Sequence, residues 1–531
     1  MCGIAAVLGT GIDERARRAF AAMASAVEPR GEVLEREELA RALLATSRLR
    51  IVDRERAVQP WADSTGRYRL IYNGEIFNHA ELRGELVAAG RPQRSQSDTE
   101  VAMEALLAWG SQALLRFRGE FALCLVDLEA GRVFVARDPA GIKPLYWARD
   151  RGLLCIASEV KALSALGSPI REVPPGHCGW VDLDCDIHTE PYIDLLRLGE
   201  DEPPIDGADE AIAAVHSTLC GAISRRIDTD LPVGVVLSGG LDSSIVAARV
   251  ARRHPDCVAF TVGSPGSEDL EYASRLTADL GIEHVVVELA PRSIGRRKVR
   301  EALRVAETTE YGDAINAVVS MEIFRAIHER GIKVCLVGDG SDELFGGYGM
   351  YQDVDPATAR RLLLHKIRQL SRTELQRVDR TSMDQRVEAR VPFLDLDMLS
   401  LSMRVPLAFK VADGYEKWVL RRAFADELPD YILARHKNPM SHSSGLHERI
   451  RLYKPLMSRW YSGFGYDAHA PMHRDFSVEL ARAGNDLQAA IDSAAAREDY
   501  TFAEHTRDFL GALRWNARNA FSPGSSSRAG R

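Results

Sequence analysis

Glycine and serine are concentrated in a short stretch with the composition of an anion-binding loop. It reads Ser238-Gly239-Gly240-Leu241-Asp242-Ser243-Ser244 and stands between a buried-strand run and a helical pattern. Glycines let backbone N–H groups approach an anion closely, and serine hydroxyls add donors at a helix N-terminus, where the dipole favours negative charge. Because Asp242 would repel a phosphate, we expect Mg²⁺ to bridge the two. The alternative is an ordinary glycine-rich turn.

A second glycine-rich stretch, residues 337–348, also follows a strand-like run and contains the carboxylates Asp339, Asp342 and Glu343. Ligands of an open parallel sheet collect beyond the carboxyl ends of its strands, so we expect both loops to face one site. Further on, Lys417 and Arg421 stand one helical turn apart. A cation there would neutralise charge on a departing phosphate group. The alternative for this pair is the surface of a helix.

At the other end of the chain, Cys2 has the position of an N-terminal nucleophile. If Met1 is removed, the thiol and a free α-amine share one residue, and the amine can serve as the base. Asn73 and Gly74 stand at a strand end, where a side-chain amide and a backbone N–H can form an oxyanion hole. The charges of Arg48 and Asp98 suit the carboxylate and ammonium of a free amino acid.

Two kinds of secondary structure must position these groups. In the first ~195 residues, segments 68–72, 121–128 and 132–137 predict antiparallel strands, with a hairpin at residues 129–131. Helical periodicity appears at residues 38–44 and 99–107. After residue 210 a helix ends near Arg226, and strands at 231–237, 257–262 and 333–337 alternate with helices such as 245–253, which predicts a parallel sheet. The part beyond residue 356 is mostly helical in pattern.

These patterns divide the chain into two domains. The acidic segment 199–207 carries two prolines and two glycines, as a linker would. We therefore predict one domain at residues 2–195, a linker at 196–210 and a second domain at 211–515. Residues 522–531 lack core-forming side chains, and we expect this tail to be disordered.

Composition excludes several functional classes. The chain has 531 residues, a formal net charge of −8 and a hydrophobic fraction of 46%, which is typical of globular domains. The acidic balance argues against a dedicated nucleic-acid binder, and no run of 18 apolar residues indicates a membrane span. The eight cysteines are scattered, which suits a reducing cytoplasm. A Walker A loop, which requires a Gly-Lys step, is missing from the sequence.

The sequence resembles the glutamine-hydrolysing asparagine synthetases over nearly all of its length to about residue 450. The Ser238–Ser244 loop resembles the S-G-G-x-D-S/T-S signature of ATP pyrophosphatases. Other matching stretches, in the family's order, are 1–4, 48–53, 73–79, 97–100, 137–146, 157–163, 174–176, 388–395 and 417–421.

This resemblance implies a two-site enzyme. The first domain would be a class II glutamine amidotransferase with an α+β N-terminal-nucleophile hydrolase sandwich, in which antiparallel sheets lie between helices. The second would be an α/β parallel-sheet ATP-pyrophosphatase domain with extra helices. Ammonia released from glutamine would pass through a tunnel, and ATP with Mg²⁺ would adenylate a small carboxylate acceptor. We expect no nucleic-acid or membrane partner. The resemblance to the family also implies a homodimer.

The resemblance also implies the roles of individual residues. The catalytic residues would be Cys2, Asn73, Gly74, Asp339 and Lys417, and Mg²⁺ would bind to Asp242 and Asp342. Glutamine would be held by Arg48, Val52, Asn73, Glu75 and Asp98. ATP would contact Leu237, Ser238, Gly239, Gly240, Asp242, Ser243, Ser244, Val262 and Gly338.

Three departures from the family pattern keep alternatives open. The family's R-H-R-G-P-D reads Glu28-Pro29-Arg30-Gly31-Glu32-Val33, next to the expected glutamine pocket. Asp339 stands where the family has glutamate, and Ile315 where we would align an arginine. The leading acceptor is aspartate, which would give asparagine, AMP and pyrophosphate. The alternatives are the same chemistry on another carboxylate, a glutamine-independent amide-forming cyclase, and a non-catalytic relative; intact Cys2, Asn73 and Asp98 argue against the cyclase.

Overall fold

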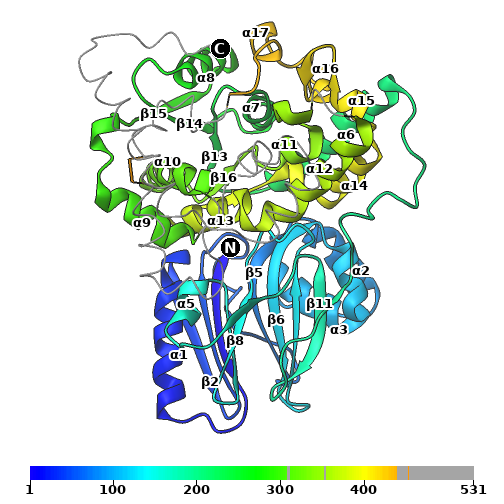
Figure 1. Ribbon diagram of the computed structural model, residues 1–531. Coiled ribbons are helices and arrows are strands. Elements are labelled where there is room, and N and C mark those ends of the chain that lie inside the picture. Colours follow the sequence, from blue (N-terminus) through cyan, green and yellow to red (C-terminus); the bar gives the residue numbers. More distant parts are fainter. Residues whose placement is uncertain (308–310, 352–354, 439–451, 454–531) are drawn as a thin grey trace.

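Four layers make up the N-terminal half of the molecule, in the order helices, sheet, sheet, helices (Figure 1). The structure, a computed structural model, describes residues 1–307, 311–351, 355–438, 452 and 453. The first sheet has the order β10-β8-β9-β1-β3-β2 and the second β12-β11-β7-β6-β5-β4, and all their pairs are antiparallel. This arrangement confirms the predicted sandwich.

Burial of both sheet faces explains why these strands are so apolar. Along β1, Ala5 and Val7 pack under the outer helices, whereas Ile4, Ala6 and Leu8 fill the space between the sheets, as the two-residue period of a strand requires. The first sheet contains β1 (Cys2–Leu8), β2 (Val33–Leu39), β3 (Ala42–Arg48), β8 (Tyr146–Asp150), β9 (Leu153–Ala157) and β10 (Ile170–Glu172). The second contains β4 (Trp61–Ala62), β5 (Tyr68–Ile76), β6 (Gly119–Asp127), β7 (Arg132–Arg137), β11 (His177–Asp182) and β12 (Glu190–Pro191).

Helices cover the outer face of each sheet. The first sheet packs against α1 (Glu14–Val27) and α5 (Val160–Ser164). The second packs against α2 (His79–Ala88), α3 (Asp98–Trp109) and α4 (Ala113–Arg116). The predicted strands 68–72, 121–128 and 132–137 and the helix 99–107 are confirmed. The predicted hairpin is confirmed as well, with Gly131 at φ +65°.

The helix predicted at residues 38–44 is wrong, because that segment forms the end of β2, a two-residue turn and the start of β3. Its apolar run, Ala42 to Ala45, is buried on both faces because α1 lies on one side and the second sheet on the other. A short continuous apolar run has no period that would separate a buried strand from a helix. Pairing with β1 on one side and β2 on the other decides in favour of the strand.

A five-stranded parallel sheet forms the centre of the C-terminal half, which confirms the predicted parallel sheet; two of its strands, 283–288 and 388–390, are not among the three that the sequence predicts. Its order is β15-β14-β13-β16-β17, and every pair is parallel. The strands are β13 (Val233–Val236), β14 (Val258–Gly263), β15 (Glu283–Glu288), β16 (Val334–Leu336) and β17 (Glu388–Arg390). The chain fills one side of β13 first and then the other side, so the order reverses between β13 and β16. Such a reversal leaves a crevice beyond the strand ends, where ligands bind.

Helices surround this sheet and continue the chain beyond it. They include α6 (Ala208–Arg226), α7 (Leu241–Arg253), α8 (Glu268–Leu280), α9 (Arg296–Ala306), α10 (Tyr311–Glu329) and α11 (Ser341–Phe345). After residue 356 come α12 (Pro356–Gln369), α13 (Glu374–Asp384), α14 (Leu396–Arg404), α15 (Leu407–Lys410), α16 (Trp418–Ala423) and α17 (Asp430–Leu433), with the small hairpin β18 (Val411–Ala412) and β19 (Tyr415–Glu416). The mostly helical pattern is therefore confirmed up to residue 433, and the predicted tail at 522–531 lies outside the described residues.

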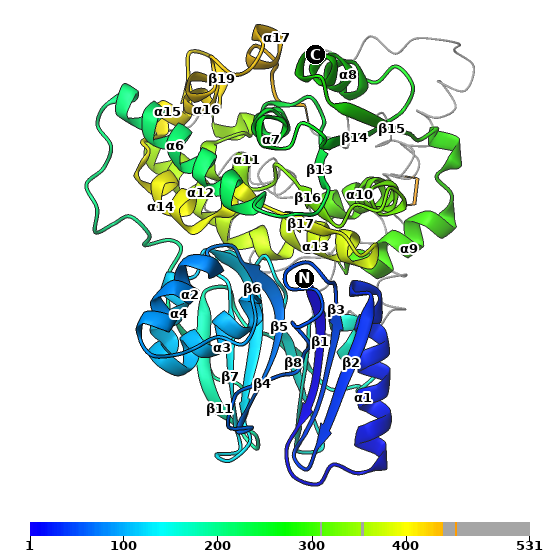
Figure 2. The ribbon, with the colours of Figure 1, turned by 180° about the vertical axis from the view of Figure 1, so that it is seen from behind.

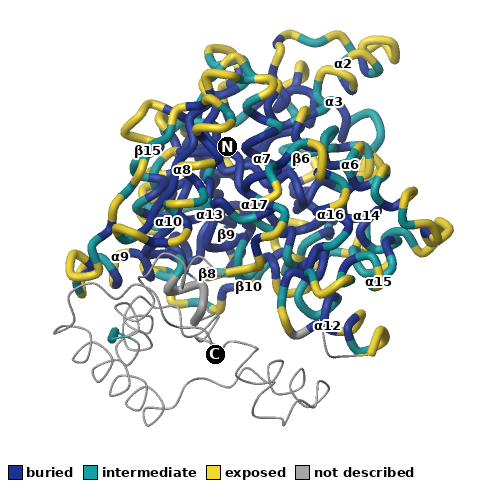
Figure 3. Tube along the Cα trace, turned by 90° about the horizontal axis from the view of Figure 1, so that it is seen from above, coloured by how far each residue is buried: buried dark blue, intermediate teal, exposed yellow. Residues whose placement is uncertain are grey.

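The two halves meet along one broad contact. Figures 1 and 2 show α13 at this junction, beside the N-terminus of the chain. In Figure 3 the buried segments fill the middle of the molecule and the exposed ones lie at its rim. Residues 192–207, between the halves, contain neither helix nor strand. All eight cysteines are free, and none of the helices in the described residues has the length and apolarity needed to cross a membrane.

Candidate active sites

The predicted thiol site assembles at the ends of β1, β3 and β5. Cys2 pairs directly with Arg48 in the register of β1 and β3. The backbone N–H of Cys2 donates to Asn73 Oδ1 at 3.1 Å, which places the two predicted catalytic residues in contact. Gly74 follows in β5, and a Cβ there would lie 2.2 Å from the backbone oxygen of Glu120, so only glycine fits. The structure thus brings together Cys2, Arg48, Asn73 and Gly74.

Burial and nearby charges set the ionisation of the Cys2 thiol. Burial raises its pKa, and the N-terminal ammonium of Met1 partly opposes that rise. In this chain the Met1 ammonium is buried and lies 2.6 Å from Glu388 Oε2 of β17. Removal of Met1 would therefore transfer the α-amine to Cys2 itself and leave Glu388 without this partner. The side-chain amide of Gln59 lies 3.9 Å from Cys2 Sγ.

Opposite charges flank the thiol, as the sequence predicts. Asp98 begins α3, and its Oδ2 accepts from the backbone N–H of Ile76 at 3.2 Å. Burial raises the pKa of Asp98. Arg48 is buried, and its guanidinium pairs with Glu35 of β2.

Val52 and Glu75, also predicted to bind glutamine, line a cleft of about 680 Å³ between the two halves. The carboxylate of Glu75, however, is directed at the second half, where it accepts from Arg390 Nη2 of β17 at 2.7 Å. Burial and the neighbouring Glu388 raise the pKa of Glu75 against the effect of Arg390. The side chain of Glu75 therefore links the thiol site to the sheet of the second half.

The predicted nucleotide loop lies where the strand order reverses. Ser238, Gly239 and Gly240 connect β13 to α7, and Ser243 Oγ donates to the backbone oxygen of Gly240 at 3.1 Å. Gly239 has φ +67°, and a Cβ there would lie 2.5 Å from Tyr272 Cβ. Ser244 Oγ is buried without a hydrogen-bond partner in the described structure. The loop and the N-terminus of α7 together form a cradle of N–H and hydroxyl donors suited to phosphate.

Two lysines hold the predicted metal-binding carboxylates together. Lys417 Nζ lies 2.5 Å from Asp242 Oδ2 and 2.6 Å from Asp342 Oδ1, and Lys437 Nζ lies 2.6 Å from Asp342 Oδ2. Burial disfavours the Asp342 carboxylate, but the two lysines outweigh it and lower its pKa. Lys417 is buried rather than on a helix surface, whereas Arg421 pairs with Glu416.

The donor set at these carboxylates fits a divalent cation. Oxygens from the first turns of α7 and α11 converge here, and the buried Asp342 Oδ1 has an ion pair but no hydrogen bond. Mg²⁺ prefers one or two carboxylates together with phosphate oxygens and water. The neighbouring Gly347 is required by the same geometry, because a Cβ there would lie 1.8 Å from Asp342 Oδ1 and 2.3 Å from Lys417 Cε.

The remaining predicted ATP contacts surround the crevice. Leu237 directly follows β13, and its backbone N–H donates to the oxygen of Phe260 in β14 at 2.9 Å. Val262 is buried two residues further along β14. Gly338 follows β16, and a Cβ there would lie 3.0 Å from Asp242 Cβ. The three residues therefore border the same strand ends as the glycine-rich loop.

Asp339, the predicted catalytic carboxylate, lies at the edge of this crevice and is bound by an arginine. Arg377 of α13 donates to Asp339 Oδ1 at 2.8 Å and to Ser320 Oγ at 2.9 Å. Asp339 is about one-fifth exposed in its side chain, at 22%. The side chain of Ile315 lies outside the described part of the chain.

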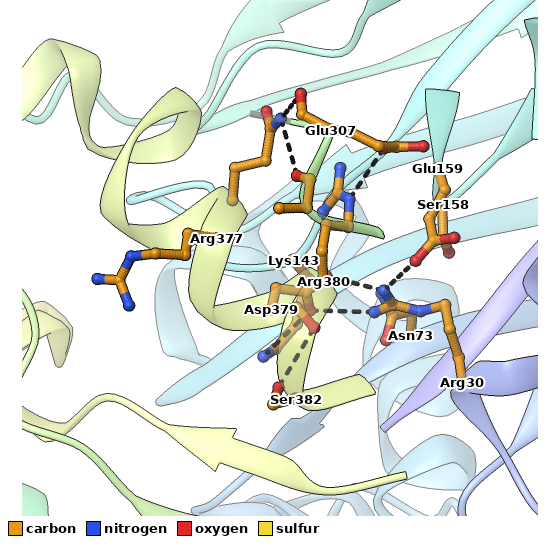
Figure 4. Close-up of polar contacts among 12 residues, drawn as sticks. Arg30, Asn73, Lys143, Ser158, Glu159, Glu307, Arg377, Asp379, Arg380 and Ser382 are labelled. Atoms are coloured by element: carbon orange, nitrogen blue, oxygen red, sulfur yellow. Dashed lines mark hydrogen bonds and ion pairs between the residues drawn. The ribbon is translucent and has the colours of Figure 1, made fainter. Parts of the chain in front are cut away.

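A buried network of charges joins the two halves between the sites (Figure 4). Arg30 donates to Glu159 Oε1 and to Asp379 Oδ2, both at 2.8 Å, and Figure 4 shows it pointing toward Asp379 of α13. Lys143 lies 3.7 Å from the same carboxylate, and Arg380 donates to it at 3.0 Å. These cations outweigh burial and lower the pKa of Asp379. The altered segment 28–33 thus provides the arginine that fixes the junction.

Several site residues have no recognisable signal in the sequence. Lys437 reaches Asp342 from a segment 95 residues away, and Arg377 reaches Asp339 from α13, 38 residues away. The spacing of residues in the sequence cannot predict contacts between partners so far apart in the chain. Gly347 could have been found, because it adjoins Gly346 directly after the acidic stretch. Glu35 stands in a strand that the sequence did not predict.

Comparisons with known proteins match both halves of the chain. A family model described as a glutamine amidotransferase domain matches residues 1–176, and one described as asparagine synthase matches residues 214–357 and 355–493. The chain is 33% identical over 429 residues to asparagine synthetase B (glutamine-hydrolyzing) of Escherichia coli strain K12, covering 76% of this chain and 75% of that protein.

Plant relatives show the same likeness. The asparagine synthetase (glutamine-hydrolyzing) of Sandersonia aurantiaca is 31% identical over 473 residues, with 84% of this chain and 87% of the relative covered. Asparagine synthetase 3 of Arabidopsis thaliana is 32% identical over 474 residues, with 84% and 79% covered. Both halves of the structure therefore have their counterpart in one known enzyme architecture. The chain belongs to the family of glutamine-hydrolysing asparagine synthetases and is a glutamine-dependent, amide-forming ligase.

Proposed function

We propose that this enzyme converts aspartate to asparagine, with glutamine as the nitrogen donor and ATP as the activating substrate. ATP would transfer its AMP moiety to the side-chain carboxylate of aspartate and release pyrophosphate. Ammonia from glutamine would then displace AMP to form the amide. The observation that supports this proposal most strongly is the cluster of Asp242, Lys417 and Asp342 beside the Ser238–Ser244 loop.

At the first site, Cys2 would attack the side-chain amide of glutamine. Asn73 and the N–H of Gly74 would stabilise the oxyanion, because such donors stabilise the charge that develops on the carbonyl oxygen. The α-amine of mature Cys2 would take up the thiol proton and deliver it to departing ammonia. Arg48 and Asp98 would hold the α-carboxylate and α-ammonium, and Val52 and Glu75 would line the pocket.

At the second site, the loop Ser238–Ser244 and Gly338 would hold the phosphates of ATP, with Leu237 and Val262 beside its nucleoside. Mg²⁺, when bound to Asp242 and Asp342, would neutralise charge on the pyrophosphate. Lys417 would stabilise the pyrophosphate as it leaves, and Lys437 lies close enough to assist it. Asp339 would act where ammonia meets the activated carboxylate. The buried junction between the halves would separate ammonia from solvent.

A different carboxylate acceptor is the second candidate, and Asp339 favours it. This side chain is one methylene shorter than the glutamate usual in the family and is bound by Arg377. Its reach into the crevice is therefore reduced. An acceptor with a longer or differently shaped carboxylate arm would compensate for that difference.

Exchange of labelled pyrophosphate into ATP distinguishes these acceptors, because it reports carboxylate activation without the amidation step. We expect rapid exchange with Mg²⁺, ATP and aspartate, and exchange near background with glutamate, malate or succinate. The matched control is Lys417→Met, which should suppress exchange with every carboxylate. Rapid exchange with another carboxylate and none with aspartate would overturn the proposed acceptor but retain the ligase chemistry.

A further inference from the structure

The arginine expected to bind the α-carboxylate of glutamine is already bound to a carboxylate of the chain. Glu35 Oε1 accepts from Arg48 Nε at 3.1 Å and from Arg48 Nη2 at 3.0 Å, and Glu35 Oε2 accepts from the same Nε at 3.2 Å. The side chains are only 7% and 14% exposed, for Arg48 and Glu35 respectively. Hydrogen bonds between an ionised arginine and a carboxylate are among the stronger polar contacts in proteins.

Few donors of Arg48 remain for a ligand. A guanidinium group has five N–H donors in a fixed plane. Glu35 takes the edge formed by Nε and Nη2, and Nη1 donates to the backbone oxygen of Arg54 at 2.8 Å. An incoming α-carboxylate must therefore displace Glu35 or lie beside it as a second anion. Both routes weaken binding, because the first loses an ion pair and the second adds repulsion between like charges.

The contact of Glu35 lies in the thiol site itself. Arg48 is the direct partner of Cys2 across β1 and β3. Glu35 Oε2 also accepts from the backbone N–H of Gln59 at 2.8 Å, and the side-chain amide of Gln59 lies 3.9 Å from Cys2 Sγ. The carboxylate of Glu35 thus contacts two residues of the thiol site, Arg48 and Gln59.

A second glutamate–arginine pair lies on the same strand, away from the thiol site. Glu37 stands two residues further along β2, on the same face, and pairs with Arg69 at 2.9 Å. That second pair lies away from Cys2 and has similar chemistry, with Nε of Arg69 donating to both carboxylate oxygens. Glu37 therefore provides a matched reference for a Glu–Arg pair in the same strand.

We propose that Glu35 is a specificity-determining residue that competes with the α-carboxylate of glutamine for Arg48. By occupying that arginine, Glu35 gives the enzyme a weak affinity for glutamine and a weak preference for donors that carry an α-carboxylate. The inference rests on the proposed function of Arg48 as the carboxylate ligand. It requires no change in the chemistry at Cys2.

Steady-state hydrolysis of glutamine by the full-length Glu35→Ala variant tests this competition. We expect KM for glutamine to fall about tenfold, the scale of one charged hydrogen-bonded contact, with kcat within about twofold of the wild type. The α-carboxamide analogue of glutamine has no carboxylate to bind Arg48, so its KM should stay the same. Glu37→Ala should leave both values unchanged.

A second variant and a double variant complete the test. Glu35→Gln keeps the side-chain shape but removes the charge, and should lower KM for glutamine in the same direction if the alanine variant folds poorly. In the Arg48→Ala background, Glu35→Ala should give no fall in KM. An unchanged or higher KM in Glu35→Ala and Glu35→Gln, or an equal fall without Arg48, would overturn the inference. Failure of the proposed function has a different signature, because Arg48→Ala alone would then leave KM for glutamine unchanged.

Discussion

Adjacent carboxyl groups at the nucleotide site have opposite ionisation. Lys417 and Lys437 overcome the burial of Asp342 and lower its pKa, so it is a carboxylate. Burial, together with the negative charges of Glu374 and Asp342, raises the pKa of Glu343 to about 8. The two lysines therefore keep Asp342 ionised, as its proposed metal-binding role requires, whereas burial and negative neighbours favour the protonated form of Glu343.

The raised pKa of Glu343 predicts a pH dependence of stability. Between its ordinary pKa of 4.5 and about 8, the folded protein holds a proton on Glu343 that the unfolded chain has released. Stability is therefore greatest below the ordinary pKa, falls as pH rises through this window by at most about 1.4 kcal/mol per pH unit, and levels off above it. A glutamine at this position cannot ionise, so the stability of the Glu343→Gln variant should not show this fall with rising pH.

Thermal unfolding of the two proteins across that pH range measures the effect. The Tm of the wild type, relative to Glu343→Gln, should fall steadily toward the upper end of the range. Glu271→Gln, at an exposed position of α8, should follow the wild type. Parallel curves for Glu343→Gln and the wild type would show that Glu343 is ionised in the folded protein.

At the scale of elements, two loops after neighbouring parallel strands create the nucleotide site. The loops after β13 and β16 meet because the strand order reverses between them. Their glycines allow the backbone to approach the carboxylates and lysines closely, which a Cβ would prevent at Gly347. The position of the loops, rather than any one residue, brings Asp242 and Asp342 to the same lysine.

Gly347→Ala should therefore disable the second site and leave the first intact. A Cβ at this position would displace Asp342 or Lys417, and a misplacement of about 1 Å can reduce the rate about a hundredfold. We expect pyrophosphate exchange to fall by about that factor while glutamine hydrolysis persists. Gly349→Ala is the matched control, because nothing lies within 4 Å of a Cβ there. Equal exchange rates in the two variants would refute the steric role of Gly347.

Local sequence patterns predicted these loops but not everything that contacts them. The run from Leu231 to Ser244 contains strand, turn and helix signals in order, so its structure follows from its neighbours in sequence. The segment 38–44 has a helix-like pattern in the sequence, but pairing with neighbouring strands makes most of it β2 and β3. Contacts such as Lys437 with Asp342 and Glu35 with Arg48 depend on the finished fold. The sequence could predict the chemistry of the sites but not all of their partners.

At the scale of the whole molecule, buried ion pairs join the two active sites. Arg30, Lys143 and Arg380 surround Asp379 from both halves, and the side chains of Arg30 and Asp379 are 1% exposed. A second bridge runs from Glu75 through Arg390 to Glu388. Such pairs are costly to break, because the remaining partner is a buried charge without compensation. They hold the halves in one relative position, as the proposed transfer of ammonia between the sites would require.

Asp379→Asn should loosen this junction. We expect a loss of about 3 kcal/mol in the free energy of unfolding, since buried cations lose their shared anion, and more glutamate released per AMP formed. Urea unfolding and the ratio of glutamate to AMP measure the two effects. Asp397→Asn weakens half-exposed pairs with Arg118 across the junction and with Arg225, and should cost at most about 1 kcal/mol. The junction would not depend on Asp379 if both variants lost the same stability.

In the function proposed here, one chain contains a thiol site that releases ammonia and a separate ATP site that uses it. Amide formation by the Cys2→Ala variant, measured with glutamine and then with ammonium chloride, tests it most directly. Product should disappear with glutamine, because no thiol remains to attack its amide, and persist with ammonia at a rate within about twofold of the wild type. Normal glutamine-supported product formation by this variant, or loss of the ammonia-supported reaction with the fold intact, would contradict the claim.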